Sequence, residues 1–375
     1  MKYDNIIIII DRLLDVNNQE MTIGGIQTYI YNLCELIRRE FNTKPYIYQN
    51  ASTDFTKNFE NFIVKGKKTN NYHKCNNLFE SVKNDFLGDE KRTLIIWGSD
   101  QYSVRQKFFR SISIQHGIGF DTEATETGIR KKLNDFNLIS LYKLFQRLRA
   151  VDLFERSDEK VCVDYNFLNW YRTFRKTDSK DITVIPNFTE IKDIKRSQNK
   201  DKIKIVYARR FVNRRGISIA LSLADYILEK YPNCEFYFAG GGDKLSQVEK
   251  FVNHNERAFL TSYKYYESVD FHSQFDIALV PSIGSEGTSL SLLEAMSAKC
   301  AVIASNVGGM TNIILDGFNG YLVNPDIDSF TQKVEYLLDN NSQLETIQNN
   351  AFSSVCSSFS KDKWDESWIK LLKRI

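Results

Sequence analysis

Residues 277–296 read IALVPSIGSEGTSLSLLEAM, and this stretch predicts a strand, a short polar loop and a helix in succession. The apolar run Ile277–Val280 suits a buried strand, and Leu290–Ser297 has a helical pattern. Free backbone N–H groups and the helix dipole at such a junction favour a phosphate. Glu286 ends the loop, and Glu294 lies about two turns into the helix. Two carboxylates beside an anion site can accept hydrogen bonds from sugar hydroxyls, although a plain helix N-terminus with a favourable glutamate would look similar.

Strands and helices alternate on both sides of this stretch. The polar segment Glu190–Lys202 indicates a linker between two such series. Short strand, helix, short strand is typical of a doubly wound α/β fold, in which ligands bind beyond the carboxyl ends of the strands. The further predicted strands are Ile6–Ile10, Thr93–Trp97, Ser111–Gln115, Lys160–Val163, Ile203–Ala208, Glu235–Ala239 and Ala301–Ala304, and the further helices are about Ile26–Arg39, Ile217–Lys230 and Lys361–Ile375.

Composition excludes several classes of protein. The chain has 375 residues, and 42% of them are hydrophobic, which is enough for two cores and argues against disorder. A net charge of +3 is too small for a dedicated nucleic-acid binder. The six cysteines show no metal-binding spacing, so we expect reduced, buried thiols in a cytoplasmic protein. No apolar run is long enough for a signal peptide or a membrane span.

Two further clusters suggest ligand contacts. Arginines crowd the end of the strand Ile203–Ala208, and fixed cations there can stabilise the negative charge of a leaving diphosphate, although a solvated charge run is the alternative. Gly24 and Gly25 precede the first helix, where the backbone can approach a ligand closely or simply turn. They do not form G-x-G-x-x-G, which argues against a dinucleotide oxidoreductase. The arginines are Arg209, Arg210, Arg214 and Arg215.

The chain resembles the retaining GT-B glycosyltransferases of the group-1, family-4-like type, which include many bacterial cell-surface polysaccharide enzymes. Glu286 and Glu294 reproduce the E-x(7)-E motif of that family. The segments AVIASNVGG (301–309) and DGFNGYLV (316–323) also look like it, and the resemblance is good from about 203 to 330. The resemblance implies two facing Rossmann-like domains with a cleft between them. We predict an acceptor-binding domain at 1–189, a linker at 190–202, a donor-binding domain at 203–355, and a C-terminal helix at 356–375 that crosses back to the N-terminal domain.

The resemblance also implies roles for individual residues. Glu286 would contact the donor sugar and Glu294 the ribose. Arg209 and Arg215 match the arginine and lysine that hold the diphosphate, with an arginine in place of the usual lysine. His116, in Gln115-His116-Gly117, would orient a sugar hydroxyl, although a lone histidine is more often structural. The predicted catalytic residues are Glu286, His116, Arg209 and Arg215, and the predicted donor-binding residues are Gly24, Gly25, Arg209, Arg215, Gly287, Thr288, Ser289, Leu290 and Glu294.

The sequence departs from the family at positions that bear on the donor. Thr288-Ser289 replace the common Phe-Gly, so the identity of the sugar stays open. Ser262 stands where the family often has glycine. Asp326-Ile327-Asp328 looks like a D-x-D metal motif, but its place before a helix predicts an N-cap. We therefore expect no metal ion and no cofactor.

A basic segment lies in the N-terminal half. Residues 129–149 carry six Lys or Arg, and Leu141, Leu144, Phe145 and Leu148 fall near one helical face. Such a helix can lie on an anionic membrane surface or can simply pack inside the domain. Arg130, Lys131 and Lys132 are the predicted membrane or acceptor contacts.

These features together predict a metal-independent hexosyltransferase. Its partners would be a nucleotide sugar, with UDP favoured over GDP, and a saccharide or lipid-linked acceptor, in the synthesis of a surface polysaccharide such as lipopolysaccharide or capsule. No nucleic acid is expected. The protein would be cytoplasmic, with the inner face of the cell membrane as a peripheral site. The alternatives are a non-catalytic nucleotide-sugar-binding subunit and an isomerase on the same fold.

Overall fold

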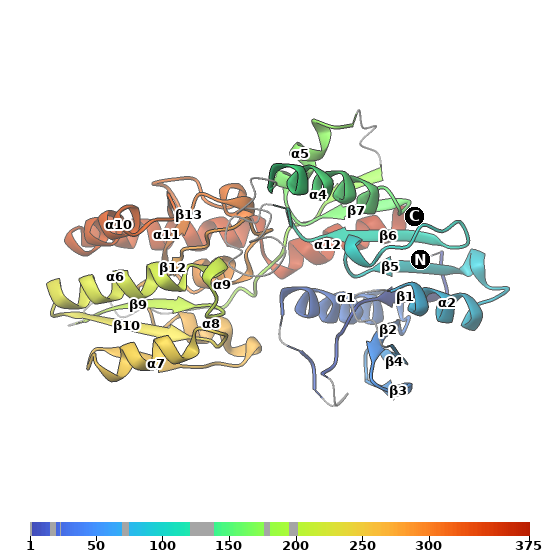
Figure 1. Cartoon of the computed structure of the whole chain (residues 1–375), viewed down its shortest axis with the longest axis horizontal. Helices are drawn as coiled ribbons and strands as arrows, with labels where there is room; N and C mark the ends of the chain where they lie inside the picture. The colour runs from blue at the N-terminus through green and yellow to red at the C-terminus, as the bar shows by residue number, and fades with distance from the viewer. Residues whose placement is uncertain are drawn as a thin grey trace. The chain divides into compact units, whose positions relative to one another are not determined.

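The chain folds into two compact units, shown in Figure 1. The computed structural model describes residues 2–15, 20–22, 24–69, 75–120, 139–175, 181–194 and 202–375. Unit 1 comprises Met1–His116, Ser140–Pro186 and Asp365–Ile375, and unit 2 comprises Asn187–Trp364 with the segment that follows His116. The chain passes into the second unit at Pro186–Asn187, three residues before the boundary predicted at 189.

Unit 1 is built on an eight-stranded sheet in the order β3-β4-β2-β1-β5-β6-β7-β8. All neighbours are parallel except the edge hairpin of β3 and β4, which is antiparallel. The apolar strand β1 is buried in the middle, as a strand covered on both faces should be. The strands are β1 (Asn5–Ile9), β2 (Tyr46–Ala51), β3 (Phe55–Asn58), β4 (Ile63–Lys68), β5 (Thr93–Trp97), β6 (Arg110–Gln115), β7 (Glu159–Cys162) and β8 (Ile182–Val184).

The helices of unit 1 connect these parallel strands. The connection from β1 to β2 is α1, whose buried face includes Tyr29, Ile30 and Leu33. The helix α5 begins at an N-cap, Asp164, whose carboxylate accepts from the N–H of Phe167 at 3.1 Å. The helices are α1 (Gly25–Phe41), α2 (Asn76–Asp85), α4 (Ile139–Phe154), α5 (Tyr165–Arg172) and the C-terminal α12 (Lys361–Arg374).

Unit 2 has an all-parallel six-stranded sheet in the order β11-β10-β9-β12-β13-β14. The order reverses between β9 and β12, the point where a doubly wound sheet binds its ligand. The strands are β9 (Ile203–Ala208), β10 (Cys234–Ala239), β11 (Ala258–Thr261), β12 (Ile277–Val280), β13 (Ala301–Ser305) and β14 (Tyr321–Val323), and the helices are α6 (Ile217–Lys230), α7 (Leu245–Asn253), α8 (Ser268–His272), α9 (Leu290–Ser297), α10 (Ile327–Asp339) and α11 (Asn341–Ser358).

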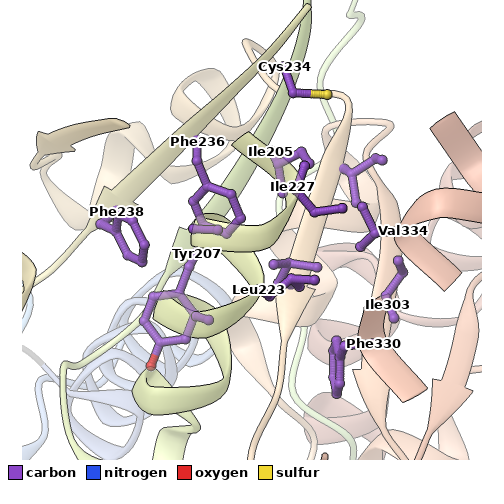
Figure 2. Close-up of a cluster of buried hydrophobic side chains, with 14 of the residues drawn as sticks. Ile205, Tyr207, Leu223, Ile227, Cys234, Phe236, Phe238, Ile303, Phe330 and Val334 are labelled. Atoms are coloured by element: carbon purple, nitrogen blue, oxygen red, sulfur yellow. The ribbon is translucent and has the colours of Figure 1, made fainter. Parts of the chain in front are cut away.

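One face of this sheet packs on α6 and α10 to form an aromatic-rich core, drawn in Figure 2. Tyr207, Phe236 and Phe238 lie side by side from β9 and β10, with Phe236 and Phe238 stacked at 4.9 Å between ring centroids. Leu223 and Ile227 of α6 cover them. Burial of such side chains contributes about 1.5–3 kcal/mol each. This packing fixes β9, and therefore the residues that follow it.

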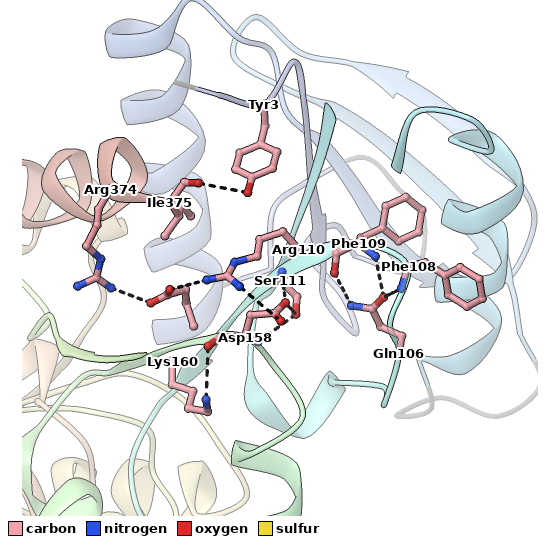
Figure 3. A network of polar contacts seen from close by, with 11 residues as sticks. Tyr3, Gln106, Phe108, Phe109, Arg110, Ser111, Asp158, Lys160, Arg374 and Ile375 are labelled. Carbon is pink, nitrogen blue, oxygen red and sulfur yellow. Dashed lines mark hydrogen bonds and ion pairs between the residues drawn. The ribbon is translucent and has the colours of Figure 1, made fainter. Parts of the chain in front are cut away.

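The last residues of the chain belong to unit 1. Trp368 of α12 is fully buried, and its indole N–H donates to the hydroxyl of Tyr29 at 2.8 Å. Figure 3 shows a polar chain at the end of the helix, in which Arg374 pairs with Glu159 at 2.7 Å and Glu159 pairs with Arg110 at 2.8 Å. Tyr3 donates to the carbonyl of Ile375 at 3.3 Å. The C-terminal helix is thus a structural part of unit 1.

The predicted elements agree closely with the structure. Every predicted strand exists, and its ends differ by one residue at most; α6 and α9 match their predicted bounds. Asp326 accepts from the N–H of Ser329 at 2.8 Å, which confirms the predicted N-cap in place of a metal ligand. The six cysteines are free thiols, and five are buried. Within the described ranges, no helix is both long and apolar enough to span a bilayer.

Candidate active site

Two neighbouring strands of unit 2 deliver the central charged residues. Arg209 directly follows β9, and Pro281 directly follows β12, so both lie at the carboxyl edge of the sheet. The loop after Pro281 then brings Glu286 back to Arg209. One terminal nitrogen of Arg209 (Nη2) lies 2.6 and 2.7 Å from the two carboxylate oxygens of Glu286. Sheet topology therefore explains how residues 77 positions apart in sequence come into contact.

Arg215 joins the same carboxylate. Its Nη1 lies 2.5 Å from Oε1 of Glu286. Arg209 and Glu286 have side chains only 5% and 8% exposed, whereas Arg215 is 26% exposed. Burial alone would raise the pKa of Glu286, but the charges of Arg209 and Arg215 and a hydrogen bond from Ser282 hold that pKa well below its usual value. Glu286 is therefore ionised at neutral pH.

The arginine-bearing loop has a defined shape. The Tyr207 hydroxyl lies 3.2 Å from the carbonyl of Arg210 and 3.0 Å from that of Arg215, so it ties both ends of the loop together. Gly216 then starts α6 with a left-handed φ of 74°. A Cβ at this position would lie 1.7 Å from the carbonyl oxygen of Pro281. Only glycine lets the chain turn here while passing so close to the other loop.

The loop from Gly284 to Ser289 is held by backbone contacts. Arg214 donates from Nη2 to the carbonyl of Ser285 at 2.7 Å, and the N–H of Gly309 donates to the carbonyl of Glu286 at 2.7 Å. The Asn187 amide donates to the carbonyl of Thr288 at 2.5 Å. These contacts fix the backbone on both sides of Glu286, so its side chain is aimed at the arginines by a rigid loop.

The predicted donor-binding run leads into α9. Gly287, Thr288 and Ser289 end the loop, and Leu290 is the first helical residue. Ser289 is the N-cap, but its side chain accepts no capping hydrogen bond. The N–H groups at the start of a helix need partners, and an anion is a good one. The segment directly follows Glu286, which contacts Arg209 and Arg215, and phosphate binding by its N–H groups stays a prediction.

Glu294 lies about one turn along α9, one turn earlier than the sequence predicted, and in different surroundings from Glu286. Burial raises the pKa of its carboxyl group to about 7, against a hydrogen bond with Ser268 that lowers it. Tyr263 lies close enough for its hydroxyl pKa to be raised by burial and, in second place, by the Glu294 charge. The two glutamates of the motif are thus electrostatically distinct, one ionised at neutral pH and one titrating near neutrality.

We expect donor binding to depend on Glu294 ionisation. A carboxylate accepts hydrogen bonds from both ribose hydroxyls, whereas its protonated form must donate one. Affinity for a nucleoside diphosphate should therefore rise as the pH increases from 5.5 to 8.5, with a midpoint near the pKa of about 7. Titration calorimetry across this range measures it. Glu294→Gln should bind weakly and without the midpoint; an unchanged pH profile in this variant would place the titration elsewhere.

In unit 1 the structure brings His116 and the paired glycines to one edge of the sheet. His116 follows β6, and its Nε2 lies 2.8 Å from the carbonyl of Gly98, which follows the neighbouring strand β5. A carbonyl only accepts, so Nε2 carries the proton and Nδ1 is the acceptor of the neutral ring. Burial lowers the pKa of His116 to about 4. His116 is therefore a neutral hydrogen-bonding group and not a proton shuttle.

Tyr29 contacts His116 and lies on the helix that begins at the paired glycines. It lies on the first turns of α1, which begins at Gly25 with Gly24 as its N-cap. Its ring meets His116 edge to face, with 5.5 Å between the centroids. Trp368 in turn donates to its hydroxyl. Tyr29 and Trp368 were not predicted as site residues, because the contacts of Tyr29 with His116 and with Trp368 join segments far apart in the sequence.

The structure also places Ser282, which the sequence did not predict, at the site. Ser282 is fully buried and accepts from Nη1 of Arg209 at 2.9 Å, a contact that no local pattern indicated. Arg130, Lys131 and Lys132 lie outside the described residues. Within the described part of the chain, no group of three or more His, Cys, Asp or Glu side chains is placed to hold a metal ion.

Comparison with known proteins finds similarity to glycosyltransferases in the C-terminal part of the chain. Residues 188–354 match the family model of glycosyl transferases group 1. The poly(ribitol-phosphate) alpha-N-acetylglucosaminyltransferase of Staphylococcus aureus is 27% identical over 200 residues, which are 52% of this chain but only 40% of that protein. The chain thus spans two-fifths of that relative's length.

Solved structures show the same fold over the whole chain. Sucrose-phosphate synthase from Thermosynechococcus elongatus superposes with a TM-score of 0.77 at 16% identity, covering 99% of this chain and 98% of that one. The Anabaena protein HepE, in complex with UDP and glucose, superposes with a TM-score of 0.70 at 12% identity, and the match covers 100% of each chain. The fold is therefore GT-B. Residues 188–354 of this fold are the part that is similar to the glycosyl transferases group 1.

Proposed function

We propose that this protein is a retaining hexosyltransferase of cell-surface polysaccharide synthesis. It would move a sugar from a nucleoside-diphosphate sugar to a saccharide or lipid-linked acceptor without a metal ion. The observation that carries the proposal is the pair of guanidinium groups that follow β9 and contact one buried carboxylate, Glu286: Arg209 is 5% exposed and Arg215 is 26% exposed. Fixed cations at that place suit a diphosphate that gains charge as the sugar leaves. A UDP donor is favoured because HepE, a structural neighbour, binds UDP and glucose.

The proposed reaction proceeds on one face of the sugar. The acceptor oxygen forms a bond to the anomeric carbon while the bond from that carbon to the diphosphate oxygen breaks. The proton of the acceptor hydroxyl passes to the leaving phosphate, and the bonding electron pair stays on that phosphate beside Arg209 and Arg215. Glu286, ionised at neutral pH, would accept a hydrogen bond from a donor-sugar hydroxyl. The anomeric configuration is retained because attack and departure share a face.

The proposal is tested with a panel of UDP-, GDP- and ADP-sugars and saccharide acceptors, with EDTA present and absent. We expect a product with the donor's anomeric configuration, measured by NMR, and an unchanged rate in EDTA. Binding without transfer would indicate a non-catalytic subunit, and interconversion of the donor sugar would indicate an isomerase. Loss of transfer in EDTA, restored by magnesium or manganese, would contradict the metal-free mechanism.

A peripheral location at the inner face of the cell membrane is the second part of the proposal. The first half of α4 exposes four apolar side chains at helical spacing: Leu141 (65% exposed), Leu144 (46%), Phe145 (61%) and Leu148 (55%). Lys143, Arg147 and Arg149 lie among them. An exposed apolar stripe with interspersed cations suits an anionic lipid surface, where each basic residue contributes about 1 kcal/mol.

We expect the protein to sediment with anionic vesicles and to be released by salt, because charge attraction to the surface is screened. Replacing Leu144 and Phe145 with serine should release it, as should serine at Arg130, Lys131 and Lys132. Leu315→Ser is the matched control, since Leu315 is as exposed as Leu141, at 65%, but lies in unit 2. Equal sedimentation with neutral and anionic vesicles, or with neither, would contradict a lipid role for α4.

A further inference from the structure

The anion-binding nitrogens of the proposed donor site are already engaged by a carboxylate of the same chain. Nη2 of Arg209 contacts both oxygens of Glu286 at 2.6 and 2.7 Å, and its Nη1 donates to Ser282 at 2.9 Å. Nη1 of Arg215 lies 2.5 Å from the same carboxylate. Both terminal nitrogens of Arg209 are thus in use before any ligand is present. A phosphate that binds these groups must take over contacts that Glu286 now makes.

Electrostatics explains why Glu286 lies between the two arginines. Two guanidinium groups close together in a poorly solvated place repel each other, and one carboxylate between them offsets most of that cost. The cluster of Arg209, Arg215 and Glu286 still carries one net positive charge. That surplus leaves an attraction for a diphosphate, which brings more negative charge and more acceptor oxygens than a single carboxylate.

Ser282 stabilises the carboxylate in this position. Its side chain is fully buried directly after Pro281, at the start of the loop that carries Glu286. The single hydroxyl accepts from Arg209 and donates to Oε1 of Glu286. One hydroxyl therefore bridges the cation and the carboxylate, and it holds both side chains in a single arrangement. A hydroxyl used in this way contributes to where Glu286 lies and not only to the packing of the loop.

We propose that Glu286, positioned by Ser282, is a built-in competitor for the diphosphate subsite of Arg209 and Arg215. The inference rests on the proposed function, because it concerns the same donor site. When the diphosphate of the donor binds the two arginines, the carboxylate is displaced and becomes available to a sugar hydroxyl. Binding of the diphosphate is thereby coupled to the movement of the Glu286 carboxylate toward the sugar. A nucleotide without the sugar must also displace this carboxylate, but it offers the carboxylate no sugar hydroxyl in return.

The competition predicts opposite effects on binding and on transfer. Glu286→Gln should bind free UDP about ten-fold more tightly than the unmodified protein, equivalent to about 1.4 kcal/mol, while its transfer rate falls. Ser282→Ala should also bind UDP more tightly, by a smaller factor, because it weakens the hold on the carboxylate. A purely structural role for either residue would weaken UDP binding instead. Titration calorimetry with UDP measures the affinities, and thermal unfolding shows that each variant is folded.

Two controls isolate the contact. Glu335→Gln removes one negative charge from unit 2 at an exposed site paired with Lys230, and it should leave UDP affinity unchanged. The double variant Arg209→Ala/Glu286→Gln should not show the increase in UDP affinity that Glu286→Gln shows. If the unmodified protein transfers sugar but Glu286→Gln and Ser282→Ala both bind UDP equally well or more weakly than it does, the competition is wrong. The proposed function would then still stand. If the unmodified protein neither transfers sugar nor binds UDP or GDP, the competition and the proposed function both fail.

Discussion

Replacing Arg209 with alanine should lower kcat/KM for sugar transfer by about 100- to 1,000-fold, the usual cost of removing one fixed group that stabilises developing charge. Arg209 is the most buried cation of the site, at 5% side-chain exposure, and it contacts Glu286 through two bonds. Its loss would remove a proposed diphosphate contact and leave Glu286 in contact with Arg215 and Ser282. Steady-state kinetics with the best donor from the nucleotide-sugar panel measures the effect.

Arg210→Ala is the matched control for this variant. Arg210 is the next residue in sequence and carries the same charge, but its side chain is exposed. It should keep nearly full activity, because an exposed cation is screened by solvent. If Arg210→Ala loses as much activity as Arg209→Ala, the effect comes from the general positive charge of the loop, and the specific role assigned to Arg209 is wrong.

Gly216→Ala should be the most destabilising single-methyl substitution at the site. Its φ of 74° disfavours any side chain, and its Cβ would lie 1.7 Å from the carbonyl oxygen of Pro281. The obstacle is backbone, so the methyl group cannot be accommodated by a side-chain rotation. We expect the free energy of unfolding to fall by at least about 2 kcal/mol, the upper cost of the left-handed conformation alone. Denaturant unfolding measures the change, and transfer activity should fall with it because Arg215 precedes this glycine.

Gly241→Ala provides the comparison. Gly241 lies in the neighbouring turn of unit 2, and a Cβ there would meet no heavy atom within 4 Å. Its unfolding free energy should stay within about 0.5 kcal/mol of that of the unmodified protein. Similar losses for Gly216→Ala and Gly241→Ala would show that the cost reflects glycine replacement in these turns in general, and not the close passage of two loops.

Eight short, largely buried strands were predicted from the sequence, although β2, which is also buried, was not. β5, β9 and β12 were predicted to the residue, because a run of apolar residues ending in a polar loop has few other interpretations. The edge hairpin of β3 and β4 was missed, since Thr56, Lys65 and Lys67 give it no apolar run. Edge strands face solvent and need not be apolar, so their sequences carry a weaker signal.

The candidate site was predictable in its residue types but not in its contacts. The E-x(7)-E spacing and the arginine cluster pointed to Glu286, Arg209 and Arg215, and the structure brings these three together. No pattern indicated that the carboxylate would occupy both guanidinium groups, because this follows from where the ends of β9 and β12 place their loops. Ser282 was missed for the same reason, since a serine after a strand is common and its partner Arg209 comes from another loop.

The burial of Trp368 against Tyr29 has a consequence for biosynthesis. The two residues are 339 positions apart, so the hydrophobic core of unit 1 contains a side chain that the ribosome delivers only after all of unit 2 has been made. All strands of unit 2 are synthesised earlier, so unit 2 can fold during translation. Unit 1 still lacks the contact between α1 and Trp368 at that stage. Nascent unit 1 should therefore depend on chaperones longer than unit 2, and ribosomes stalled before residue 368 should carry a folded second unit and a protease-sensitive first one.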